Sequence, residues 1–72
     1  MREIAKSQHD IIEFCLEFKA FHRCWPGIKE ICQALRVDYD SAFADVLDLE
    51  QDGHIWRNPW AEVEVIAVAS VA

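Results

Sequence analysis

The spacing of the apolar residues changes at Gly53, and this change constrains the fold more than any other feature of the chain. Before Gly53, apolar side chains recur at intervals of three and four residues, as at Ile28, Ile31 and Leu35, which is typical of an amphipathic helix. After it, residues 61–65 alternate between apolar and polar side chains, which is typical of a strand. The sequence therefore predicts helices followed by a β-hairpin.

Punctuating residues divide the chain into its elements. Ser7 is expected to cap the first helix, because its hydroxyl can accept from the exposed amides of the first turn. Pro26 is expected to separate the first two helices, because a proline disfavours the helical conformation in the residue before it. Gly53 is expected to end the third helix in a left-handed conformation. The expected elements are helices over residues 7–22, 27–37 and 40–52 and a hairpin over residues 54–69.

Composition limits the chain to one small folded domain. It has 72 residues, of which 53% are hydrophobic and 28% charged, so it lacks the signature of disorder. Its charge is unevenly distributed: residues 1–37 hold six basic and five acidic side chains, a balance of +1, whereas residues 38–72 hold Arg57 and eight acids, a balance of −7. The C-terminal half should repel nucleic acid and attract a basic protein surface.

The stretch from Ile31 to Ile55 contains an Ala-Leu-x-Val run at 34–37, a polar turn, a Ser-Ala pair at 41–42, and the ending Leu-Glu-x-Asp-Gly-x-Ile at 49–55. With these motifs it resembles the winged helix-turn-helix superfamily, which includes the DNA-binding domains of LexA-like and Crp- or GntR-like bacterial repressors. The resemblance implies a small α+β winged helix-turn-helix fold, with three helices and a hairpin wing. It also implies that the core contains Ala34, Leu35, Val37, Ala42, Val46 and Leu49.

The third helix departs from the superfamily in its charge. Between Asp38 and Asp52 it carries six carboxylates and no cation, although a DNA-reading helix presents basic side chains to phosphates. Tyr39, Phe43 and Leu47 are spaced by four and form one stripe, with acidic residues around it. An apolar centre with a charged rim is typical of a protein-binding surface. The candidate partner-binding residues of this helix are Tyr39, Asp40, Phe43, Ala44, Asp45, Leu47 and Asp48.

The sequence leaves other placements open for several apolar residues. A small rotation of the third helix would bury Phe43 and Leu47 in the core. Trp56, Arg57 and Trp60 are candidate partner-binding residues of the wing, because aromatic and Arg side chains are favoured interface anchors, but the tryptophans can equally cover the core. The wide apolar face of the first helix fits either a central position or a homodimer. The apolar tail at 66–72 fits either an edge strand that pairs with a second chain or a closing terminus.

The favoured function is a small non-enzymatic regulator or inhibitor that contacts a basic protein, by mimicry of nucleic acid, and its size fits a phage-encoded protein. The alternative is a DNA-binding transcriptional regulator, either a dimeric repressor or excisionase-like, and a scaffold module is a third hypothesis. The sequence shows no catalytic motif, so neither an enzyme nor a cofactor is expected. Its three cysteines form no CxxC pair, so we expect buried, reduced thiols and no metal site. Without an apolar N-terminal segment, we expect a cytoplasmic protein that does not enter the membrane.

Overall fold

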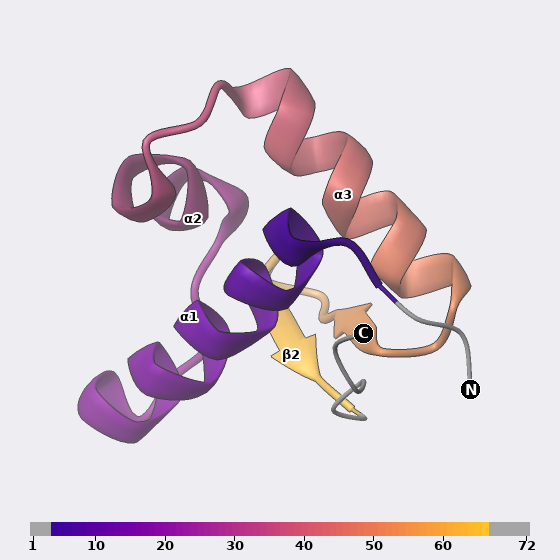
Figure 1. Cartoon of the computed structure of the whole chain (residues 1–72). Helices are drawn as coiled ribbons and strands as arrows, with labels where there is room; N and C mark the ends of the chain where they lie inside the picture. Colours follow the sequence, from indigo (N-terminus) through magenta and orange to yellow (C-terminus); the bar gives the residue numbers. More distant parts are fainter. Residues whose placement is uncertain (1–3, 67–72) are drawn as a thin grey trace.

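The computed structural model describes residues 4–66 as three helices followed by a two-stranded antiparallel hairpin. Figure 1 shows the helices around the hairpin, whose strands lie against α1 and the C-terminal end of α3. The predicted α+β fold, a small winged helix-turn-helix arrangement, is confirmed. Its elements are α1 (Lys6–His22), α2 (Ile28–Leu35), α3 (Tyr39–Gln51), β1 (Ile55–Arg57) and β2 (Val63–Val65).

The core lies where the three helices meet the hairpin. α3 contributes Ala42, Val46 and Leu49, which follow one another at intervals of four and three and are at most 1% exposed. The carried-over core positions Ala34 and Val37 are wrong, because α2 ends at Leu35 and both side chains are exposed. The remaining apolar core residues are Ile4, Ile11, Ile12, Cys15, Ile28, Ile31, Ile55 and Val63.

The predicted ends of α1 and α3 lie within one residue of the observed ones, whereas α2 ends at Leu35, two residues before its predicted end. The Asp38 carboxylate caps α3, since it accepts from the Ser41 backbone N–H at 3.3 Å and from the Ser41 hydroxyl at 2.8 Å. Gly53 follows α3 with φ +81°, so the left-handed ending is confirmed. The expected Ser7 cap is wrong: α1 begins at Lys6, and Gln8 Oε1 accepts from the Ala5 N–H at 3.2 Å instead.

The connection between α1 and α2 also joins the wing. The Val63 N–H donates to the Pro26 carbonyl at 2.7 Å, and Gly27 forms an isolated antiparallel bridge with Glu62. Pro26 thus ends the helical path and also offers its carbonyl to β2, although a proline cannot donate to a strand. β2 is therefore held between β1 and the start of α2. Of the predicted hairpin, residues 67–69 lie outside the described part of the chain.

The three cysteines are free and differ in exposure. Cys15 is fully buried, Cys32 is half-buried and Cys24 is exposed, so the expectation that all three are buried is wrong for Cys24. Burial raises the pKa of the Cys15 thiol to about 12, because the thiolate would lose its hydration.

We expect Cys15 to resist alkylation in the folded protein. A thiol with a pKa of about 12 is ionised in only about one molecule in ten thousand at pH 8, and the thiolate is the reactive species. Iodoacetamide at pH 8, followed by peptide mass spectrometry, should modify Cys24 first and Cys15 only in denaturant. Cys24 serves as the internal control, and equal modification of Cys15 and Cys24 in the native protein would contradict the core described above.

Candidate functional site

The Tyr39, Phe43 and Leu47 stripe lies on the side of α3 that faces the hairpin. Tyr39 is 48% exposed, whereas Phe43 and Leu47 are half-buried. Phe43 packs against the core, and its ring stacks on Tyr39 with centroids 5.9 Å apart. Neither alternative for Phe43 and Leu47 therefore holds fully, since each side chain is partly covered by the fold and partly open to solvent.

Arg57, the one cation of the C-terminal half, is held against α3. Its guanidinium donates to both carboxylate oxygens of Glu50, at 3.2 and 3.1 Å, and lies 5.5 Å from the Phe43 ring centroid. The Arg57 and Glu50 side chains are 33% and 31% exposed. A partly buried bidentate pair thus neutralises Arg57, the candidate partner-binding cation of the wing.

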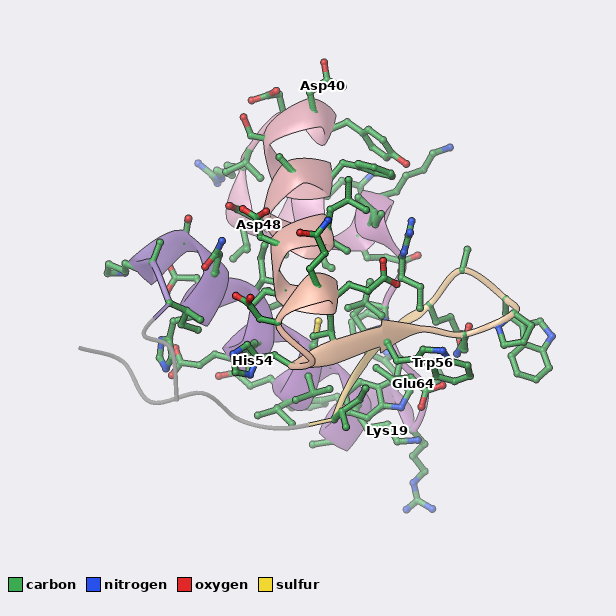
Figure 2. All side chains as sticks on the ribbon, turned by 90° about the vertical axis from the view of Figure 1, so that its right-hand side faces the viewer. Lys19, Asp40, Asp48, His54, Trp56 and Glu64 are labelled. Carbon is green, nitrogen blue, oxygen red and sulfur yellow. The ribbon has the colours of Figure 1, made fainter. Side chains whose placement is uncertain are left out.

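Asp45 and Asp48 form an acidic flank of α3 that is separate from the stripe of Tyr39, Phe43 and Leu47. Asp45 lines a hollow with Asp10 of α1, and Asp48 accepts from Gln8 Nε2 at 3.4 Å. Asp40 is exposed near the start of α3, and Figure 2 shows Asp40 and Asp48 along the helix. Asp45 and Asp48 therefore lie on the side of α3 nearer α1, whereas Glu50 lies with Phe43 beside Arg57 of the hairpin.

Ala44 is exposed on α3 between these two flanks. The Ala44 methyl group has neither charge nor a hydrogen-bonding atom. It therefore extends neither the acidic flank nor the aromatic stripe, and the two surfaces stay separate. Asp38, at the start of the same helix, has its pKa lowered by the hydrogen bonds from the Ser41 hydroxyl and backbone N–H. These hydrogen bonds therefore favour the ionised form of the Asp38 carboxyl.

The two wing tryptophans are exposed rather than folded over the core. Trp56 is 48% exposed and Trp60 79%, whereas Trp25 is the tryptophan that packs against the core. Trp56 stands opposite Glu64 in the hairpin register, and Figure 2 shows these two residues together on β1 and β2. Trp60 lines a second, shallow hollow with Tyr39 and the start of α2. The alternative in which these tryptophans cover the core does not hold.

Asn58 fixes the tip of the wing. Its Oδ1 accepts from the backbone N–H groups of Trp60 and Glu62 at 2.9 Å, and its Nδ2 donates to the Glu62 and Glu64 carboxylates, also at 2.9 Å. The side chain is 6% exposed. Asn-Pro predicts a turn, but the sequence does not show that the amide would organise both arms of the hairpin.

Part of the apolar face of α1 remains outside the core. Ile11, Ile12 and Cys15 are buried, whereas Phe21 is 87% exposed and Leu16 39%. Toward its C-terminal end, α1 carries a row of rings, with Phe14 and Phe18 centroids 5.7 Å apart and Phe18 and His22 centroids 4.2 Å apart. The central position of α1 therefore explains why one side of its apolar face is buried, but Phe21 and Leu16 remain exposed to solvent.

A small group of potential metal ligands lies on the exposed side of α1. His9, Asp10 and Glu13 place one ligand atom each within 4.8 Å of one another. His9 Nδ1 lies 3.8 Å from Glu13, and Lys6 Nζ lies 3.2 Å from Asp10. These contacts are those of ion pairs between successive helical turns, and only the spacing of the three residues could have indicated the group from the sequence.

Comparison with protein-family models gives no match, and a search of curated proteins gives none either. No helix in residues 4–66 combines the length and the apolar character that crossing a membrane requires. The fold and the placement of charge within it are therefore the observations from which a function can be argued.

Proposed function

We propose that the chain is a small non-enzymatic winged-helix protein that acts by contact with a basic protein through the acidic flank of α3. The observation that carries this proposal is the charge of α3, the helix that corresponds to the DNA-reading helix of winged-helix proteins, and of the wing beside it. α3 contributes carboxylates and no cation, and Glu50 neutralises Arg57 of the wing. A nucleic acid brought to this side would meet repulsion where affinity requires neutralised phosphates.

The same charge suits a partner that itself binds nucleic acid. Carboxylates along one side of a helix offer such a partner a row of negative groups in place of phosphates, and complementary charge raises the rate of encounter. Tyr39 and Trp60, both largely exposed, add apolar contact area beside this surface. We therefore propose that the chain is an inhibitor that competes with nucleic acid for its partner and is built on a winged-helix scaffold. We further propose that it acts in the cytoplasm and is of phage origin.

A DNA-binding regulator is the second candidate, and one observation favours it. Arg23, Lys29 and Arg36 are exposed at the end of α1 and along α2, away from the acidic flank. Duplex bound there would contact α2 rather than α3, which is not how the superfamily reads a groove. A homodimer through α1 also stays a prediction, supported by the exposure of Phe21 and Leu16.

Titration of labelled duplex DNA at about 50 mM and about 200 mM salt separates the two candidates, because a protein that neutralises several phosphates loses orders of magnitude in affinity over this range. We expect no saturable binding at either concentration. Saturable binding with a steep salt dependence would overturn the proposal and favour the regulator.

The partner arm of the experiment uses charge reversal. A protein retained by the wild-type chain should be lost on Asp45→Lys/Asp48→Lys and kept on Glu13→Lys/Glu17→Lys. The second variant makes the same charge change at exposed positions of α1. Equal loss in both variants would mean that net charge, rather than the acidic flank, determines retention.

A further inference from the structure

A hollow between α1, the end of α2 and α3 combines an apolar lining with an acidic rim. Its volume is about 120 Å³, well below the roughly 300–1,000 Å³ of small-molecule sites. It therefore has room for the end of one side chain rather than for a cofactor. The apolar lining residues are Ile11, Leu35, Val37 and Ala42, and the polar ones are Ser7, Asp10, Ser41 and Asp45.

The rim carries two carboxylates from different helices and, among the lining residues that the structure describes, no cation. Asp10 lies on α1 and Asp45 on α3. Asp10 already accepts the Lys6 ammonium, at 3.3 and 3.2 Å, which shows that a cation can approach it. The Lys6 side chain is 84% exposed, so an incoming cation can displace it into water at little cost.

The lining matches a side chain that has an apolar stem and a cationic end. Such side chains lay their methylene groups along apolar surface and keep the charged group at a polar edge. A guanidinium has five N–H donors in a planar fork and can bond two carboxylates at once, whereas an ammonium acts as a compact point charge. The two separate carboxylates of the rim therefore favour arginine over lysine.

We propose that this hollow receives one arginine side chain of the basic partner, with its stem against Leu35 and Val37 and its guanidinium between Asp10 and Asp45. The inference rests on the proposed function and specifies the partner chemistry at the acidic flank of α3. It also moves the centre of that contact away from the Tyr39, Phe43 and Leu47 stripe, toward the side of α3 that faces α1.

The test is an NMR titration of the whole chain with a capped peptide that has one arginine between alanines. We expect shifts centred on the backbone amides of Val37, Ala42 and Asp45. Asp45→Asn removes one rim charge, and Val37→Phe fills the hollow while it keeps both carboxylates. Each should weaken the peptide about fivefold to tenfold, the loss expected for one charge-assisted contact.

The matched control is Glu17→Gln, which removes one negative charge, as Asp45→Asn does, at an exposed position of α1 outside the hollow. It should weaken the peptide less than about twofold, as expected for an exposed charge. Thermal melts of each variant show whether it is folded, and Val37→Phe and Asp45→Asn test the hollow independently of each other.

Three results would overturn the inference. Equal weakening by Glu17→Gln and Asp45→Asn, with no effect of Val37→Phe, would mean diffuse attraction to an acidic surface, and the proposed function would survive. An absence of shifts around the hollow would remove the site, while the DNA and partner measurements would still decide the proposed function. Equal binding of the matching lysine peptide would overturn the assignment to arginine.

Discussion

Replacement of Leu49 by alanine should leave the protein largely unfolded at 37 °C. Leu49 is fully buried on the core side of α3, and its truncation removes contacts and leaves a cavity that the neighbouring side chains fill only in part. Such changes cost about 2–5 kcal/mol. The total for a 72-residue chain is roughly 4–11 kcal/mol at about 0.05–0.15 kcal/mol per residue, so this one change removes much of it.

Leu47→Ala is the matched control, because Leu47 lies two residues away on the same helix and is only half-buried. Thermal melts followed by circular dichroism should show a drop in Tm of at least about 10 °C for Leu49→Ala, since each kcal/mol corresponds to about 4–8 °C in a domain of this size. Leu47→Ala should lower Tm by less than half as much. Equal losses would mean that α3 is rotated and that Leu47 belongs to the core.

The fold was predictable because its signals are local. The interval of seven between Ala42 and Leu49 and the left-handed Gly53 each depend on residues within one or two helical turns. The Ser7 cap was not, because α1 begins one residue earlier: Ala5 occupies the N-cap position, and the Gln8 side chain accepts from the Ala5 N–H. Errors of this kind move a helix end by a residue and leave the topology unchanged.

The candidate site was less predictable, because its important contacts join distant parts of the sequence. Arg57 was recognisable as an isolated cation, but nothing local indicates that Glu50 holds it in a bidentate pair. Asp45 was recognisable as acidic, but its place beside Asp10 depends on how α1 crosses α3. The period of four that grouped Tyr39, Phe43 and Leu47 was real, yet the direction of that stripe is set by where the hairpin packs.

Replacement of both Asp40 and Asp48 by lysine should give the chain an affinity for duplex DNA that the wild type lacks. Both side chains are exposed on α3, which under the proposed function corresponds to the DNA-reading helix, and the change raises the formal net charge from −6 to −2. With two new phosphate contacts, binding should weaken about tenfold between 50 mM and 200 mM salt. Fluorescence anisotropy with a labelled duplex measures both quantities.

The control for this gain is Glu13→Lys/Glu17→Lys, which gives the same net charge but places the cations on exposed positions of α1. It should bind DNA at least about tenfold more weakly than Asp40→Lys/Asp48→Lys, because charge away from the groove-facing helix attracts the duplex without docking it. Equal binding by the two variants would show that net charge alone keeps the wild type from DNA. Binding restricted to the α3 variant would mean that this scaffold keeps the geometry of a groove reader and that its carboxylates are what turn it away from nucleic acid.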